Sequence, residues 1–258
     1  MTEERPPGEP TRGPSPFPST HWSLLKPGDP ESRDEAPRRA GLDALARLYW
    51  KPVYAHFRLK WGQSREEAED LTQEFFAWIV EGPFLDRAEP GRGRFRNFVR
   101  AHLDHFILNR LRAGRRLKRG GGQRPVSIDF GNAPDEILED SRNVSPEEAL
   151  DRQWRRTVLD EALGRLRRGL EAEGRSVVYE TLRRYDLAAP EERPTYARLA
   201  AELNIAPSDV DNHLSAARRR LYECLKEVIA SSVDGPEALR EELDSFFPGG
   251  GRPDAPAR

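Results

Sequence analysis

Cysteine and long apolar runs are scarce in this chain of 258 residues. Cys224 is the single cysteine, so no internal disulfide can form, and such sparing use of cysteine is typical of a reducing compartment. No apolar run approaches the roughly 18–20 residues that cross a bilayer, and the first residues lack the apolar centre of a secretory signal. The composition therefore predicts a cytoplasmic protein with no membrane partner.

Runs of β-branched residues bounded by turn residues are also scarce. Leu, Ala, Arg and Glu dominate instead, with 33% of residues charged and 36% hydrophobic. So low an apolar fraction favours small helical units with flexible segments over one large core. We therefore expect an all-α fold: two small helical domains joined by a flexible linker, the second ending in a helix-turn-helix.

Recognisable catalytic motifs are absent as well. The sequence contains no Gly-rich phosphate loop, no zinc-ligand spacing and no paired carboxylates in a plausible site. His102, Asp104 and His105 come nearest to a metal site, but Asp104 falls on a different helix face from His102 and no cysteine is near. A solvated or hydrogen-bonded pair is the default interpretation. The prediction is a non-enzymatic protein without metal or cofactor.

Changes in composition divide the chain into five segments. A Pro-rich arm has too little apolar surface to order itself, and a Gly-rich stretch without periodicity reads as a linker. Apolar periodicity before the linker is interrupted at Pro52 and stops at Gly62. The expected segments are a disordered arm at 1–20, a helical domain at 21–113, a flexible linker at 114–144, a helix-turn-helix domain at 145–232 and a tail at 233–258 with a short amphipathic helix.

An acidic helix is predicted to begin at Ser64. Glu67 follows three residues later, which is the spacing of a capping box. At about 100° per residue, the apolar side chains fall on one side, and Asp70, Gln73 and Glu74 fall together on the other. Taken without context, that outward face is a solvated helix surface.

A strongly basic helix follows from about Phe95. The formal net charge of −2 conceals this block, because fields act locally over a Debye length of about 8–10 Å. Such a block is typical of a surface that binds a phosphate backbone. For Phe95, Phe98 and Phe106, a place in the core is favoured over stacking on bases. The block is opposed only by Asp104 and consists of Arg92, Arg94, Arg96, Arg100, Arg110, Arg112, Arg115, Arg116, Lys118 and Arg119.

Residues 195–222 have the spacing of a helix-turn-helix. Thr195 caps the first helix, Ala200 is the small residue where two helices touch, and Asn204 stands at a turn position that often needs positive φ. Ser208 opens the second helix, whose outward positions are Asp211, Asn212, Ser215 and Arg219, flanked by Arg218 and Arg220. Two alternatives remain open: any antiparallel helical hairpin shares this spacing, and Asp211 could complete a capping box with Ser208.

Three strings together resemble bacterial RNA polymerase sigma factors of the extracytoplasmic-function type. Glu67-Ala-Glu-Asp-Leu-Thr-Gln-Glu-Phe-Phe76 resembles the helix that binds the polymerase clamp. Gly93-Arg-Phe-Arg-Asn-Phe-Val99 and the basic helix after it resemble the segment that opens the −10 promoter element. Thr195 to Leu221 resembles the helix-turn-helix that reads the −35 element. The resemblance covers residues from about 22 to 230 in the order of the family.

The resemblance implies a region 2-like domain at 21–113 and a region 4-like domain at 145–232. Asp70, Gln73 and Glu74 would contact the clamp. The −10 region would be held by Arg94, Arg96, Arg100, His105, Arg110, Arg112, Arg115 and Arg116. The −35 region would be read by Asp211, Asn212, His213, Ser215, Arg218 and Arg219. The implied partners are core RNA polymerase, through its clamp and flap regions, and promoter DNA, with an anti-sigma factor as a further candidate.

The chain departs from the family at several positions. Asp211 and His213 stand where basic residues are common, Asn204 replaces a turn glycine, and His105 aligns with an asparagine that captures flipped bases. The alternative function is a helix-turn-helix regulator that binds an operator without stable attachment to core polymerase.

Overall fold

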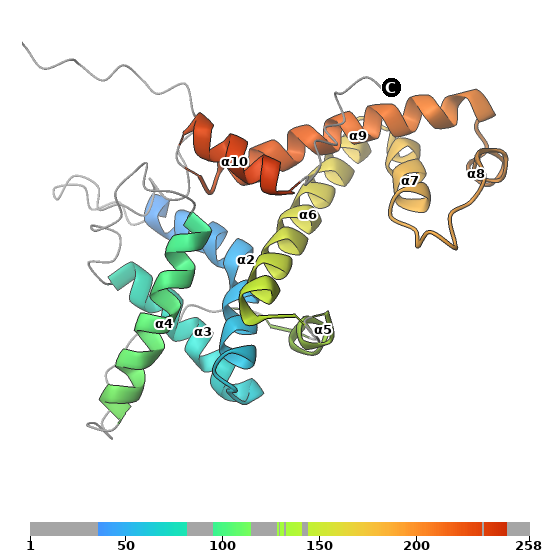
Figure 1. Cartoon of the computed structure of the whole chain (residues 1–258). Coiled ribbons are helices and arrows are strands. Elements are labelled where there is room, and N and C mark those ends of the chain that lie inside the picture. The colour runs from blue at the N-terminus through green and yellow to red at the C-terminus, as the bar shows by residue number, and fades with distance from the viewer. Residues whose placement is uncertain are drawn as a thin grey trace, which may run out of the picture.

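The computed structural model describes residues 36–81, 95–114, 128, 130–131, 133–140, 144–233 and 235–246. In this part of the chain every regular element is a helix, which confirms the all-α prediction (Figure 1). The helices are α2 (Ala36–Leu59), α3 (Arg65–Glu81), α4 (Phe95–Gly114), α5 (Ala133–Asp140), α6 (Pro146–Ala172), α7 (Ser176–Tyr185), α8 (Tyr196–Leu203), α9 (Pro207–Ala230) and α10 (Pro236–Phe246).

Helix α2 runs through Pro52 without interruption, so the predicted break there is wrong. A proline inside a helix costs about 3 kcal/mol, because it removes one backbone hydrogen bond and crowds the preceding turn. Tyr54 and Phe57 on this helix are fully buried, and α2 packs against α3, α5 and α6. Tertiary packing therefore outweighs the local cost. The chain turns after α2 at Gly62, which has φ +61° as its predicted stop position requires.

The capping box at the start of α3 is confirmed. The Ser64 N–H donates to Glu67 Oε2 at 3.0 Å, and the Glu67 N–H donates to Ser64 Oγ at 3.2 Å. The apolar side of α3 is buried against α2, with Phe75 and Ile79 fully excluded from solvent. Asp70 on the opposite side is exposed, as the helical periodicity predicts.

Helix α6 joins the two ends of the molecule. It begins with a capping box formed by Ser145 and Glu148, with Pro146 in the first turn. With 27 residues the helix is about 40 Å long. Its N-terminal half packs on α2 in a hydrophobic cluster that includes Trp154 and also reaches the C-terminal part of α9. Its C-terminal half packs on α7 and α9 in a second cluster around Leu166 and Leu170.

The predicted linker is in part ordered. Residues 133–140 form α5, which packs on α2 and buries Ile137. Just before it, the ring of Phe130 lies edge-on to Trp50, with 5.2 Å between ring centroids. Part of the segment 114–144 is therefore ordered, because the side chains of Phe130 and Ile137 pack against α2. Residues 115–127 lie outside the described part of the chain.

The helices separate into two regions along α6 (Figure 1). Helices α2, α3 and α4 gather near its N-terminal half, with α10 alongside the C-terminal part of α9. Helices α7 and α8 lie at the other end with the N-terminal part of α9. The tail helix expected after residue 233 is α10, which buries Glu242 and Leu243. The described parts of the two predicted domains share the cluster around Trp154.

Candidate nucleic-acid interface

The turn between α8 and α9 has the backbone conformation expected of a helix-turn-helix. Asn204 adopts φ 52° and ψ 48°, and it is the only non-glycine residue with positive φ among the described residues. Its N–H donates to Ala201 O, and the Ile205 N–H donates to Ala200 O at 3.1 Å. This pair of bonds is a Schellman motif, which satisfies the last carbonyls of the helix. The predicted positive φ is confirmed, and asparagine tolerates it better than other side chains.

Buried side chains hold α8 against α9. Leu199, Ala200, Val210 and Leu214 form one cluster and are 0–2% exposed, and Ile205 from the turn packs against them. At the start of α8, the Thr195 hydroxyl accepts from the Arg198 N–H, which confirms the predicted cap. The small side chain of Ala200 allows the close contact predicted there.

Helix α9 begins one residue before the predicted start. Pro207 occupies the first turn, and the N-cap Ala206 makes no side-chain cap hydrogen bond. Ser208 therefore lies inside the helix, and the capping-box interpretation of Asp211 is wrong. Asp211 is exposed, so its carboxylate is available to a partner.

Four of the six predicted −35 residues share one exposed face of α9. Asp211, Asn212, Ser215 and Arg219 are all exposed, and their spacing of three or four residues stacks them along the helix. The Asn212 side chain donates to Ser208 O at 3.3 Å. Arg219 has no ion-pair partner in the described part of the chain. We call these four residues the α9 face.

The other two predicted −35 residues point toward α7. Arg218 donates from Nε and Nη2 to the two carboxylate oxygens of Asp186, both at 2.8 Å, which is the bidentate geometry of a strong ion pair. This contact raises the pKa of Arg218. His213 Nδ1 lies 3.4 Å from Thr181 Oγ1. Arg218 and His213 thus hold α9 against α7 and its C-cap residue, and their predicted contact with the −35 element stays a prediction.

Arg220 is also engaged within the protein. Its guanidinium binds Glu173 at 2.6 Å and crosses α6 at Gly169, where an added Cβ would stand 2.8 Å from Nη2. An added Cβ would therefore require the flexible Arg220 guanidinium to shift. Of three consecutive arginines, Arg219 alone belongs to the α9 face.

The predicted −10 cations on the first half of α4 are covered by acidic residues. Arg96 is 3% exposed, and its Nη2 lies 3.1 Å from Oε2 of Glu242, which is 1% exposed. The guanidinium also stacks over the ring of Trp154, 4.5 Å from the centroid, with Nε 3.4 Å from Asp151. Arg100 donates to Asp151 at 2.8 Å. In this conformation α6 and α10 supply carboxylates that neutralise Arg96 and Arg100, and DNA binding by these two residues stays a prediction.

The second half of α4 is more open. His105, Arg110 and Arg112 are exposed, and His105 Nε2 lies 2.8 Å from the Asn109 side chain. Arg110 Nη2 donates to Glu74 at 2.5 Å, so a residue predicted to bind DNA pairs with one predicted to bind polymerase. Gln73 and Glu74 are half-buried, whereas Asp70 is exposed.

The remaining predicted −10 residues, Arg94, Arg115 and Arg116, lie outside the described residues. The side chains of Phe95 and Phe98 also lie outside them, while Phe106 is buried as predicted.

Asp104 is a structural residue rather than a stray charge in the basic block. Its carboxylate accepts from His56 at 3.0 Å, Lys60 at 2.7 Å and Trp61 at 3.1 Å. Although burial opposes ionisation, the hydrogen bonds from Lys60, His56 and Trp61 hold the pKa of Asp104 below its ordinary value. Burial lowers the pKa of His56, although the bond to Asp104 acts in the opposite direction. Because a carboxylate only accepts, Nε2 of the neutral imidazole carries the proton.

Sequence reasoning did not identify the acidic partners of these cations. Asp151, Glu242 and Asp186 each bind an arginine from another helix, and no local pattern pairs residues 96 and 242. The described residues contain no group of three or more His, Cys, Asp or Glu positioned to hold a metal ion, and none of the described helices is long and apolar enough to cross a membrane. Comparison with known protein families, curated proteins and solved structures finds no match to this chain.

Proposed function

We propose that the chain is a cytoplasmic, non-enzymatic sigma factor that docks on core RNA polymerase and directs it to promoters. The observation that carries this proposal is the α9 face, presented after a left-handed turn at Asn204. The order of the acidic helix, the basic helix and the helix-turn-helix also supports it. The proposed function requires no catalytic site on this chain, because the polymerase performs catalysis.

The α9 face has side chains suited to reading the major groove at the −35 element. The Asn212 amide can pair with the N6 and N7 positions of adenine, and the Arg219 guanidinium can bind guanine or a phosphate. The Asp211 carboxylate can only accept, so cytosine N4 is the base edge that it suits. The −35 sequence should therefore offer a cytosine opposite the first turns of α9.

The acidic side of α3 would bind the clamp. Asp70 is exposed, and its carboxylate is not ion-paired within the described residues, so it is free to meet a cation of the polymerase. Glu74 is held by Arg110, so clamp binding through Glu74 would release Arg110. That release would leave the exposed guanidinium of Arg110 unpaired on the second half of α4, where the −10 DNA is proposed to lie.

Binding of −10 DNA by Arg96 and Arg100 would require α4 to separate from α6 and α10. A base extracted from the stack costs a few kcal/mol, and the covered cations add the cost of breaking their contacts with Asp151 and Glu242. Attachment to polymerase would provide the free energy for this separation. A sigma factor of this kind would therefore bind −10 DNA poorly when alone.

The experiment is size fractionation of the purified chain mixed with core polymerase. Co-elution is expected, and Asp70→Ala should weaken it. The double variant Glu136→Ala/Glu139→Ala, which removes two exposed charges from α5, is the matched control and should co-elute normally. Absence of co-elution for the unaltered chain would contradict the proposal.

One observation favours the operator-binding regulator as a second candidate. In the described conformation the α9 face is open while Arg96 and Arg100 are covered, so the free chain is better arranged for duplex binding than for strand opening. Tight binding of a palindromic duplex by the chain without polymerase would favour this second function.

A further inference from the structure

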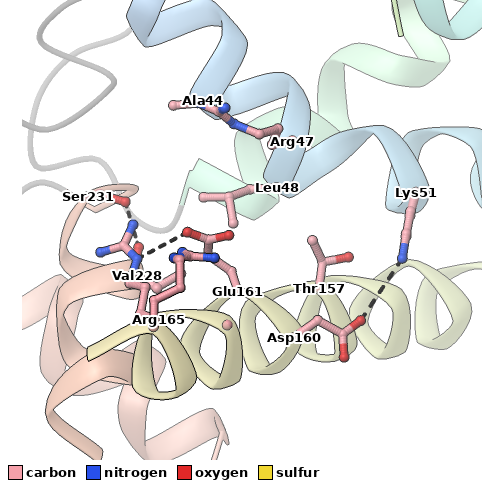
Figure 2. Close-up of a pocket in the computed structure, with 12 residues that line it drawn as sticks. Ala44, Arg47, Leu48, Lys51, Thr157, Asp160, Glu161, Arg165, Val228 and Ser231 are labelled. Atoms are coloured by element: carbon pink, nitrogen blue, oxygen red, sulfur yellow. Dashed lines mark hydrogen bonds and ion pairs between the residues drawn. The ribbon is translucent and has the colours of Figure 1, made fainter. Parts of the chain in front are cut away.

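A cavity of about 580 Å³ lies where α2, α6 and α9 meet (Figure 2). Its lining comes from the middle of α2, residues 157–168 of α6 and the C-terminal end of α9, whereas the α9 face begins near the N-terminus of α9. Its size is within the range of about 300–1,000 Å³ that is usual for sites that bind small ligands. None of its lining residues was assigned a role in binding DNA or polymerase.

The cavity has an excess of positive charge. Arg47, Lys51, Arg165 and Arg168 line it, opposed by the two carboxylates of Asp160 and Glu161. Glu161 Oε1 is paired with Arg165 Nε at 3.1 Å. Lys51 Nζ lies 4.0 Å from Asp160 Oδ2, which is beyond hydrogen-bond length. Arg47 and Arg168 have no ion-pair partner among the residues that the structure describes. Two arginines from different helices thus border the cavity with unused donors.

Gly164 allows one of these arginines to lie back over α6. A Cβ at this position would stand 3.2 Å from Nη1 of Arg168, so a larger residue would displace the guanidinium by a few tenths of an ångström. A glycine in the middle of a helix costs about 0.5–1 kcal/mol relative to alanine. Its presence at this point of α6 keeps the arginine head close to the cavity wall.

The remaining lining combines apolar groups with hydroxyls that can accept. Leu48 and Val228 are buried apolar residues of the lining, and of the two only Leu48 keeps exposed surface, at 5%. Thr157 donates its proton to Gln153 O at 2.8 Å and Ser231 donates to Val228 O at 2.6 Å. Each hydroxyl oxygen therefore keeps its lone pairs for N–H or O–H donors of a ligand.

We propose that this cavity binds a phosphorylated small molecule of nucleotide size. Arg47 and Arg168 bind the phosphate groups, because guanidinium groups match phosphate oxygens in pairs. Lys51 contributes a third cation by exchanging its long contact with Asp160 for a phosphate oxygen. The sugar or base packs on Leu48 and donates to Thr157 and Ser231.

The test is calorimetric titration of the full chain with inorganic pyrophosphate and with ADP, without polymerase or DNA. Saturable binding near one equivalent is expected for both, with ADP the tighter ligand because it also meets the apolar wall. Arg47→Ala and Arg168→Ala should each weaken binding about tenfold, and Arg168→Lys less. Both arginines are exposed, so the unfolding midpoint should not change.

Matched variants separate this site from general attraction of anions. Arg167→Ala removes the neighbouring charge, which pairs with Glu171 outside the cavity, and Arg219→Ala removes a charge from the α9 face; neither should alter pyrophosphate binding. Binding that is absent in the unaltered chain, or that is as tight in Arg47→Ala and Arg168→Ala as in the unaltered chain, would overturn the proposal. Loss of duplex DNA binding in these two variants, as large as in Arg219→Ala, would assign the surface to DNA and would also overturn it. Since polymerase is not in the assay, the outcome is independent of the proposed sigma-factor function.

Discussion

The α9 face and the first half of α4 both carry arginines, but the arginine of the α9 face is exposed and those of α4 form ion pairs within the protein. Arg219 on α9 is exposed and faces outward, whereas Arg96 on α4 is 3% exposed and lies between Glu242 and Trp154. The two regions were equally plausible DNA surfaces on composition. The difference teaches that an arginine is available to a phosphate only if no carboxylate of the same protein already forms an ion pair with it.

The largest effect is expected when the buried ion pair between Arg96 and Glu242 is broken. Glu242→Ala leaves the buried guanidinium of Arg96 without its main partner, and removal of one partner of a buried ion pair costs about 3–5 kcal/mol. Urea denaturation should show this loss in the free energy of unfolding. Glu237→Ala, at an exposed position on the same helix, should change it by less than about 1 kcal/mol. A loss below 1 kcal/mol for Glu242→Ala would mean that α10 does not hold α4.

The open region depends on its turn. Asn204→Val places a β-branched side chain at φ 52°, which costs about 1–3 kcal/mol. Chemical denaturation measures the cost, and duplex binding should weaken because the α9 face loses its fixed position. Asn204→Gly is the control and should be within about 1 kcal/mol of the unaltered chain. Equal stability of the valine and glycine variants would be inconsistent with a required left-handed turn.

The two regions should respond differently when single arginines are removed. Arg219→Ala should weaken binding of the free chain to a duplex carrying its recognition sequence about tenfold, since one good base or phosphate contact contributes about 1–3 kcal/mol. Arg100→Ala should leave this binding nearly unchanged, because the Arg100 guanidinium already forms an ion pair with Asp151. Fluorescence anisotropy at two salt concentrations measures both variants. A larger effect of Arg100→Ala than of Arg219→Ala would reverse the comparison.

The smallest effect concerns pH and the contact of α4 with α2. His56 has a pKa below its ordinary value because it is buried, so the unfolded chain binds a proton at a higher pH than the folded chain does. The free energy of unfolding should therefore decrease as pH falls below about 6.5, by at most about 1.4 kcal/mol per pH unit from this group.

Urea denaturation at pH 7.5 and 5.5 measures that slope. His56→Gln should flatten it, whereas replacement of the exposed His105 by Gln should leave it unchanged. A second decrease is expected in stronger acid, as the Asp104 carboxylate, whose pKa is also lowered, becomes protonated. An unchanged slope in His56→Gln would show that His56 is not the titrating group.

Local features of the fold could be predicted from the sequence. The capping boxes at Ser64 and Ser145, the cap at Thr195 and the left-handed Asn204 are each determined within three or four residues. The apolar period of α3 likewise identified its buried side. Such features depend on backbone geometry that neighbours in sequence already define.

Features that depend on distant contacts could not be predicted. Arg96 and Glu242 are 146 positions apart, and nothing in either neighbourhood indicates the other. The fold of α5 depends on a site for Ile137 on α2, and Pro52 lies within α2 because of packing rather than propensity. The role of Arg218 also depends on Asp186, the C-cap residue of α7. Which arginines remain free is therefore a property of the tertiary structure.

Run-off transcription with purified core polymerase tests the central claim most directly. On fragments of genomic DNA from the source organism, start sites should be selected only when the chain is added. The single substitutions Asp70→Ala, which we expect to weaken docking, and Arg219→Ala, which we expect to weaken promoter binding, should each reduce the product. Product that does not depend on the chain, or complete absence of product with an active polymerase, would contradict the account.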